Sequence, residues 1–386
     1  MEFNINLPKD ILELHTIFKN NGFKLFLVGG CVRDALLEIK PKDFDLVTDA
    51  LPDTIINILH KENIVKSILE TGKSFGVINV ITENDEYEIA TFRCDGLYSN
   101  GRRPDTVKFT TIEEDVLRRD LTINALYYDI TNKMVIDLVD GIEDLYKKTI
   151  RTVGIPKERF TEDRLRILRT FRFASRFDSK RDFEIDDEIK RDNDISLISS
   201  ERIRDEFIKI IKSSSSTNNV LNELNDFGLL EQILPSLTLD LNFDFKSIEN
   251  HIVVLSILLK NKQNKIKNIK RILKTLKYNN NEIYNIVLNI KIIRILTIKN
   301  GFIDFNVIFN IVKYFKKANP NIEIMESVFN NLGYNKEILK HIIEFEFSVT
   351  GENVMEKFNI KPGPKLGNKI KELEIDNLKN ILLEYF

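Results

Sequence analysis

Two aspartates two residues apart, Asp43 and Asp45, are the residues whose type and spacing most directly suggest chemistry. They lie in DFDLVT (43–48), whose alternation predicts a strand, and a strand's period of two places both carboxylates on one face. Two like charges held this close repel each other unless a cation lies between them. Carboxylate oxygens suit Mg²⁺, which takes one or two protein carboxylates together with phosphate oxygens. Glu88, in another strand-like segment, is a candidate third carboxylate.

A glycine pair precedes these acids. In LVGGCVRD (27–34), Gly29 and Gly30 follow an apolar run and precede a predicted helix that begins near Val32. Glycine lets backbone N–H groups approach a phosphate, and a helix N-terminus adds partial positive charge. Arg33 could bind the same phosphates with its planar guanidinium. Neither G-x-G-x-x-G nor the Walker pattern occurs, which excludes the Rossmann and P-loop interpretations, but the parts suit a metal-dependent phosphoryl-transfer site.

The elements that must position these residues follow from hydrophobic periodicity. In the first 150 residues we expect helices near 10–19 and 53–63, and strands at 25–30, 43–48, 76–82, 87–93 and 134–140. After Pro156 the strand signals become scarce, and 158–177 has the period of one long helix. The sequence therefore predicts an α+β chain with a mixed sheet first and an all-helical region from residue 151 to the end.

Composition places the chain among cytoplasmic globular proteins. Its 386 residues are 42% hydrophobic and 30% charged, which is too apolar for a disordered protein. Two cysteines, Cys31 and Cys94, cannot make a disulfide framework or a zinc cluster, so a reducing cytosol is expected. No window of 18 uncharged apolar residues occurs, and the N-terminus does not resemble a signal peptide, so we expect no membrane partner.

Charge is distributed unevenly along the chain. Residues 216–250 hold six acids and one base, whereas residues 251–300 hold eleven bases and one acid. A basic block on predicted helices suits contacts with nucleic-acid phosphates, although a solvated lysine face is the plainer alternative. The candidate RNA-binding residues within it are Lys265, Lys267, Lys270, Arg271 and Lys274.

The segment VGGCVRDALLEIKPKDFDLVT resembles motif A of the class II tRNA nucleotidyltransferases, the family of CCA-adding enzymes and bacterial poly(A) polymerases in the polymerase-beta-like superfamily. Further segments resemble the family's other motifs in order. They are YEIATFRCDGLYSNGRRPDTVKF (87–109, third carboxylate and flexible loop), EEDVLRRDLTINAL (113–126, motif B), IDLVDGIEDL (136–145, motif C), RFTEDRLRILRTFRF (159–173, motif D), SSERIRDEFIKII (199–211, motif E) and a tail segment at 350–370.

The resemblance implies a polymerase-beta-like catalytic head at 1–150, a helical neck at 151–215, and a body at 216–320 and tail at 321–386 that bind tRNA at its 3′ acceptor end and elbow. It implies two Mg²⁺ ions on Asp43 and Asp45, with Glu88 orienting or deprotonating the attacking hydroxyl. CTP and ATP would be the substrates, and no obligate protein partner is implied. The nucleotide-binding residues by this resemblance are Gly29, Gly30, Arg33, Arg119, Asp120, Asn124, Asp163, Arg166, Arg169 and Arg172.

Motif D also has a physical interpretation. In a helix Asp163, Arg166 and Thr170 share a face, and one acceptor beside one donor can match the hydrogen-bonding edge of C or A but not that of G or U. The arginines of this segment recur at 166, 169, 172 and 176. With only Glu162 and Asp163 nearby in sequence, we expect surplus positive charge, with Arg169 and Arg172 nearer the triphosphate.

Several alternatives remain at this stage. Within the family the chain could add only CC, only A, or a poly(A) tail; the retained loop GLYSNGRRPDT (96–106) favours completing the A. From other classes, it could be a catalytically silent RNA-binding protein on the same fold or a nucleotidyltransferase that modifies a small molecule. Intact Asp43, Asp45 and Arg166 argue against the first, and the basic helical region against the second.

Overall fold

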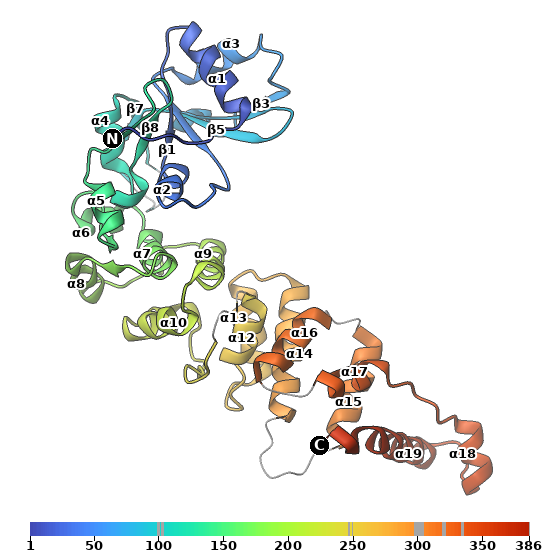
Figure 1. The fold of residues 1–386 in the computed structure, drawn as a ribbon. Coiled ribbons are helices and arrows are strands. Elements are labelled where there is room, and N and C mark those ends of the chain that lie inside the picture. The colour runs from blue at the N-terminus through green and yellow to red at the C-terminus, as the bar shows by residue number, and fades with distance from the viewer. Residues whose placement is uncertain are drawn as a thin grey trace. The chain divides into compact units, whose positions relative to one another are not determined.

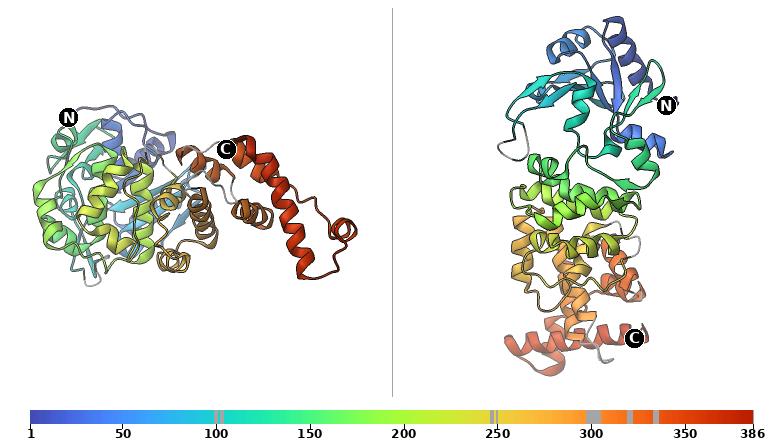
Figure 2. Two further views of the ribbon diagram at one scale, coloured as in Figure 1. Left: turned by 90° about the horizontal axis from the view of Figure 1, so that it is seen from below. Right: turned by 90° about the vertical axis from the view of Figure 1, so that its left-hand side faces the viewer.

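The computed structural model describes residues 1–98, 101, 104–245, 248, 250–296, 305–318, 322–332 and 336–385. The chain forms two compact units. Unit 1 consists of residues 1–206 and 226–229, and unit 2 of residues 207–225 and 230–386. A mixed sheet lies in unit 1, whereas the described residues of unit 2 form helices only (Figures 1 and 2). The predicted α+β class is therefore confirmed, but the region from residue 151 is not all-helical, because Lys180–Arg181 forms a short strand that pairs with Thr149–Ile150.

Seven strands form the main sheet of unit 1, in the order β3-β4-β5-β2-β1-β8-β9 (Figure 1). All neighbouring pairs are antiparallel except β2 and β5, which are parallel. The strands are β1 (Leu25–Val28), β2 (Asp45–Thr48), β3 (Ser67–Leu69), β4 (Val77–Ile81), β5 (Glu86–Thr91), β8 (Tyr127–Asp129) and β9 (Met134–Ile136). Two small ladders join β6 (Arg93–Asp95) to β7 (Val107–Phe109) and β10 (Thr149–Ile150) to β11 (Lys180–Arg181).

Helices cover this sheet and form the rest of the chain. In unit 1, α1 and α3 pack on each other and against the sheet, and α2 follows β1 directly (Figure 1). The helices of unit 1 are α1 (Lys9–Asn20), α2 (Gly30–Leu36), α3 (Pro52–Leu59), α4 (Ile112–Asp115), α5 (Gly141–Tyr146), α6 (Pro156–Glu162), α7 (Leu165–Arg176) and α8 (Phe183–Arg191); α9 (Ser200–Ser213) begins in unit 1 and ends in unit 2.

Unit 2 is a helical assembly with its own core. One apolar cluster joins α14, α15, α16, α17 and α19 around Leu288, Ile308 and Leu378. Its helices are α10 (Thr217–Asp226), α11 (Leu229–Ile233), α12 (His251–Leu258), α13 (Ile266–Thr275), α14 (Asn280–Leu296), α15 (Phe305–Ala318), α16 (Ile322–Leu332), α17 (Lys336–Glu344), α18 (Gly351–Phe358) and α19 (Pro364–Leu382). Among the described residues, no helix has the length and apolar character needed to cross a membrane.

Three differences from the predicted elements concern the site. Strand β2 begins at Asp45, so Asp43 precedes the strand rather than lying within it. Strand β9 ends at Ile136 because Asp137 accepts the backbone N–H groups of Gly141 and Ile142 at the start of α5. The predicted helix 158–177 is two helices, α6 and α7, since Asp163 between them is extended. Asp163 therefore does not share a helix face with Arg166.

Candidate active site

Strand register brings the glycine turn and the acids together. In the β1–β2 ladder Val28 is opposite Asp45, so Gly29 and Gly30 follow directly from the position beside Asp45. In the parallel β2–β5 ladder Leu46 is opposite Ile89, which places Asp45 next to Glu88 on the neighbouring strand. Both carboxylates are on the exposed face of their strands. The three residues expected to be catalytic are thus contributed by the loop before β2, the start of β2 and the adjacent strand β5.

These acids influence one another electrostatically. Desolvation, together with the negative charges of Glu88 and Asp43, raises the pKa of Asp45 to about 6, and the positive charge of Arg119 opposes the rise. None of the three forms an ion pair with another described residue. No group of three His, Cys, Asp or Glu side chains within the described part of the chain could hold a metal ion by itself. Two carboxylates without a cationic partner fit Mg²⁺, which completes its coordination with water and substrate oxygens.

The glycine turn has a conformation that requires glycine at one position. Gly29 precedes α2 with φ of 77°, in the left-handed region, and its N–H donates to the carbonyl of Leu126 at 2.9 Å. A Cβ at Gly29 would lie 3.4 Å from the backbone oxygen of Asn124. The turn is therefore held against motif B.

Arg33 is held by protein partners and is only 3% exposed. Its Nε and Nη2 donate to Asp34, and its Nη1 donates to Asn124. Its guanidinium also lies over the rings of Phe173 and Phe177, at 5.1 and 4.9 Å from their centroids. Arg33 thus connects the glycine turn to motif B and to α7 as well as carrying positive charge beside the turn.

Asp115 organises motif B. This carboxylate is fully buried and accepts hydrogen bonds from Arg118, Arg119 and the hydroxyl of Tyr127. Burial alone would favour its neutral form, but the two guanidinium groups outweigh burial and lower its pKa. Arg119 is fixed by Asp115 and Tyr127, at a position where its charge acts on Asp45.

Asp120 and Asn124 form the second part of motif B. Asp120 accepts from Nε of Arg169 at 2.6 Å and from the side-chain amide of Asn124 at 3.3 Å. Burial opposes the ionisation of Asp120, but Arg169 and Arg166 outweigh it and lower the pKa to about 2. Because Asn124 also accepts from Arg33, a continuous chain of hydrogen bonds joins α2, motif B and α7.

The arginines of motif D do not leave the expected surplus of positive charge. Each has a carboxylate partner, and three of the four partners come from distant segments. The pairs are Arg166 with Glu162, Arg169 with Asp120, Arg172 with Glu206 and Arg176 with Asp34. Only Glu162 is a local partner in sequence, and the tertiary structure supplies the other three acids. Burial nevertheless lowers the pKa of Arg172 to about 10, against the opposing effect of Glu206.

The two residues expected to select the base are also engaged. Both carboxylate oxygens of Asp163 accept from Arg202 on α9, at 3.1 and 2.6 Å, and one also accepts the N–H of Leu165. Arg166 donates to Glu162 and to the backbone oxygens of Arg159 and Arg118. A carboxylate has about four lone-pair sites and a guanidinium has five N–H donors. Each residue therefore keeps hydrogen-bonding capacity for a nucleotide.

Three supporting residues, Asp115, Tyr127 and Arg202, were not among the predicted site residues. Asp115 and Tyr127 fall within or next to the segment that resembles motif B, and Arg202 falls within the one that resembles motif E. An acid three and four residues before paired arginines is a helical ion-pair signal that could have identified Asp115. Part of the flexible loop, including Ser99, Asn100, Arg102 and Arg103, lies outside the described residues.

In unit 2 the candidate RNA-binding residues gather on and beside one helix. Helix α13 buries Ile269, Ile272 and Leu273 on its inner side. Lys267, Lys270, Arg271 and Lys274 occupy positions i, i+3, i+4 and i+7 on the opposite side and are exposed, as is Lys265 just before the helix. Two other bases of the 251–300 block have internal roles: Lys260 pairs with Asp240, and Arg294 donates to the carbonyls of Lys260 and Asn264. The exposed basic face of α13 therefore contains only part of the positive charge counted in residues 251–300.

Comparisons with known proteins agree with this arrangement. Residues 25–151 match the family described as "Poly A polymerase head domain", and residues 182–241 match "Probable RNA and SrmB- binding site of polymerase A". The chain is 32% identical over 405 residues to the CCA-adding enzyme of Ligilactobacillus salivarius, covering 98% of this chain and 96% of that one. It is 32% identical over 398 residues to the CCA-adding enzyme of Pediococcus pentosaceus, covering 97% and 96%.

Solved structures share the fold. The CCA-adding enzyme of Bacillus stearothermophilus in complex with CTP matches with a TM-score of 0.67 at 22% identity, covering 96% of this chain and 93% of that one. The Thermotoga maritima CCA-adding enzyme complexed with tRNA matches with a TM-score of 0.68 at 19% identity, covering 98% and 95%. Together with the near full-length identity to its relatives, the chain belongs to the CCA-adding enzyme family of tRNA nucleotidyltransferases.

Proposed function

We propose that this chain adds C, C and A to the 3′ end of tRNA from CTP and ATP, without a nucleic-acid template, and releases pyrophosphate. The 3′-hydroxyl oxygen of the tRNA attacks the α-phosphorus of the nucleotide, and the bond to the pyrophosphate leaving group breaks. The observation that carries the proposal is the register that puts the glycine turn, Asp45 and Glu88 side by side in a member of this family.

We assign Asp43 and Asp45 as ligands of two Mg²⁺ ions, since both are exposed carboxylates without a cationic partner among the described residues. When bound, the ions supply charge neutralisation of the triphosphate and activation of the attacking hydroxyl. Glu88 lies next to Asp45 and orients the hydroxyl or accepts its proton. Gly29 shapes the turn, with its own N–H bonded to Leu126, so that Gly30 offers its backbone N–H group to the triphosphate; Arg33 and Arg119 add positive charge near it.

We assign base selection to Asp163 and Arg166. Asp163 accepts the exocyclic amine of C or A with a lone pair that Arg202 leaves available, and Arg166 donates to the neighbouring ring nitrogen. G and U present donor and acceptor in a different order, and buried groups would then lack partners. We assign contact with the sugar to Asp120 and Asn124, which are hydrogen-bonded to each other, and contact nearer the triphosphate to Arg169 and Arg172.

We assign tRNA binding in unit 2 to the basic face of α13, namely Lys265, Lys267, Lys270, Arg271 and Lys274, because these side chains are exposed and form no ion pair within the described residues. The acceptor end and elbow of tRNA are the expected contacts. We expect the reaction to take place in the cytoplasm, where both free cysteines stay reduced.

Pyrophosphate release tests the proposal against the silent RNA-binding and small-molecule alternatives. The unmodified chain with CTP, ATP and Mg²⁺ should release pyrophosphate only when tRNA is present. Asp45→Asn should abolish release while tRNA affinity changes less than about twofold, because the substitution removes one charge at a site remote from α13 in sequence. Turnover without RNA, or tRNA binding without any turnover of the unmodified chain, would refute the proposal.

A further inference from the structure

A cavity of about 330 Å³ lies in unit 2, between α15, α19 and the extended segment 345–349. Its volume is at the lower end of the usual 300–1,000 Å³ range for small-molecule sites. We call it the α19 cavity, and it is lined by Phe309, Lys313, Phe347, Val349, Gly367, Ile370, Lys371 and Glu374. The walls are mostly apolar, and none of the individual residues assigned above to catalysis or to RNA binding on α13 contributes to them.

Glu374 gives the α19 cavity an unmet hydrogen-bonding demand. The residue is only 1% exposed. Its Oε1 accepts the backbone N–H of Val349 at 2.5 Å, whereas its Oε2 is buried and has no hydrogen-bond partner in the described structure. A buried polar atom left unpaired costs about 1–3 kcal/mol, more if charged, so its persistence points to a ligand that donates a hydrogen bond.

Two aromatic rings and two lysines define what else the ligand must carry. Phe309 and Phe347 pack edge to face with centroids 5.5 Å apart, and Phe347 is 41% exposed, so it offers a ring face for stacking. Lys313 and Lys371 also line the cavity, and the Lys371 ammonium lies 6.0 Å from the centroid of Phe309. A flat ring with an N–H donor and an attached anionic group satisfies all these features.

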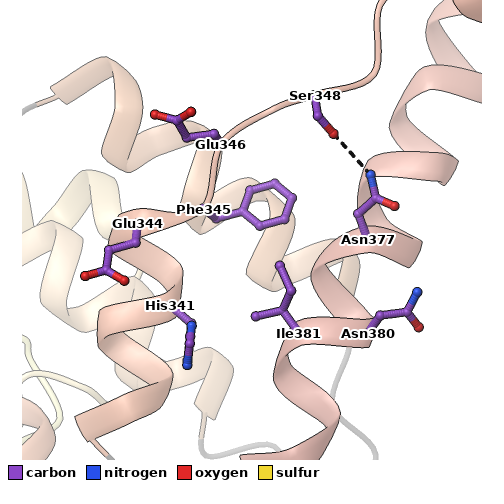
Figure 3. A pocket seen from close by; sticks show the side chains of 8 residues that line it. All are labelled: His341, Glu344, Phe345, Glu346, Ser348, Asn377, Asn380 and Ile381. Carbon is purple, nitrogen blue, oxygen red and sulfur yellow. Dashed lines mark hydrogen bonds between the residues drawn. The ribbon is translucent and has the colours of Figure 1, made fainter.

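The neighbouring cavity provides a contrast. It has about 570 Å³ and uses the other side of the same segment, where Ser348 and Asn377 are joined by a hydrogen bond (Figure 3). Among the described residues, its lining contains Glu344 and Glu346 but no lysine or arginine, which disfavours an anionic ligand. The combination of a buried acceptor, an exposed ring and lysines is therefore a property of the α19 cavity rather than of this part of the fold in general.

We propose that the α19 cavity binds one nucleotide unit whose base carries an exocyclic amino group. The amino group donates to Oε2 of Glu374, the base stacks on Phe347, and the phosphate lies near Lys313 and Lys371. Guanine, adenine and cytosine carry such an amine and uracil does not. A free mononucleotide and an unstacked base of an RNA strand share this chemistry, and the experiment below distinguishes them. The site is additional to the nucleotide site proposed in unit 1.

The chain contains no tryptophan, so Phe347→Trp creates a single fluorophore in the cavity wall. In that full-length background, GMP, AMP or CMP should quench the fluorescence saturably, and UMP should bind at least about tenfold more weakly. Glu374→Gln keeps the acceptor for Val349 but replaces Oε2 by a donor, and it should weaken binding at least about tenfold. Glu372→Gln, two residues away on the exposed side of α19, is the matched control and should change nothing.

A second variant tests the space rather than the hydrogen bond. Gly367 lines the cavity, and a Cβ added there would meet no atom within 4 Å. Gly367→Leu therefore adds bulk at the cavity wall, and leucine also favours the helix more than glycine does. In the chain without the added tryptophan, equilibrium dialysis of labelled GMP should show that Gly367→Leu also weakens binding at least about tenfold. This measurement excludes an effect of the tryptophan reporter itself.

The ligand that quenches the tryptophan fluorescence identifies the source of the nucleotide. Quenching by mononucleotides assigns a free nucleotide, whereas quenching by a tRNA transcript alone, lost in Glu374→Gln, assigns a base of the RNA strand. The proposal is overturned if no ligand quenches, if UMP binds as tightly as the other mononucleotides, or if Glu374→Gln retains the affinity of the unmodified cavity while circular dichroism shows both variants folded.

Discussion

The ion pair between Arg202 and Asp163 gives the sharpest test of base selection, because Arg202 is expected to act only by orienting Asp163. Arg202 donates to both carboxylate oxygens, and the two side chains are 20% and 15% exposed. Interactions of this kind with charged groups contribute about 1.5–3 kcal/mol, and because the pair is partly exposed we take about 2 kcal/mol for the pair as a whole. Without Arg202, Asp163 can rotate away from the base.

A loss of about 2 kcal/mol corresponds to a factor of about 30 in kcat/KM. Arg202→Ala should therefore lower kcat/KM for CTP by about thirtyfold and reduce discrimination against UTP and GTP by a similar factor. Arg202→Lys should be intermediate, since an ammonium cannot span both carboxylate oxygens as a guanidinium does. The assay is single-turnover extension of a tRNA transcript that ends before CCA, with each of the four nucleotides in turn.

Arg204→Ala on the same helix is the matched control, because Arg204 pairs with its neighbour Asp205 rather than with a proposed base-reading residue. It should leave selectivity unchanged. Thermal unfolding establishes that each variant is folded. Discrimination against UTP and GTP that stays at the level of the unmodified chain in folded Arg202→Ala would refute the role of Asp163 in reading the base.

Two further predictions concern RNA binding and acid stability. Replacing Lys267, Lys270 and Lys274 by Gln should raise the KM for tRNA and reduce the slope of log affinity against log salt concentration by about 2–3. Replacing the exposed Lys61, Lys133 and Lys180 of unit 1 by Gln is the control and should change neither quantity. A slope that stays unchanged in the α13 variant would mean that this basic face is only solvated and does not contact RNA phosphates. Asp120 has a folded pKa of about 2 against an ordinary 3.8, so its contribution is present above pH 4 and is lost as the pH falls toward 2. The stability advantage over Asp120→Asn should shrink by about 1 kcal/mol between pH 5 and pH 3 in urea unfolding, and an advantage that does not change with pH would contradict the ion pair with Arg169.

The parts of the site that sequence identified are those fixed by local chemistry. The glycine turn after an apolar run, the paired aspartates and the amphipathic α13 each follow from spacing that a strand or helix imposes, and the structure has them in those elements or beside them. The α+β order also followed, because alternating and helical periods separate cleanly near residue 150. Strand β8 was missed although it pairs with β1, since three residues are too few for a periodic signal.

The parts that sequence did not identify depend on contacts between distant segments. The net charge around the α7 arginines could not be judged from the neighbouring sequence, because the fold brings Asp34, Asp120 and Glu206 to them from distant segments. The helix break at Asp163 was hidden for a similar reason. Its carboxylate accepts from Leu165 at the start of α7 and from Arg202 on another helix, so a residue with helical spacing takes an extended conformation.

The most direct test of the central claim uses three tRNA transcripts, ending before CCA, after C and after CC. Each is incubated with the unmodified chain, Mg²⁺ and CTP, ATP or both, and products are resolved at single-nucleotide length. The account predicts that all three are extended to a common CCA end when both nucleotides are present. Extension of the CC-ended transcript alone by one A, a long poly(A) ladder, or no extension of any transcript would contradict it.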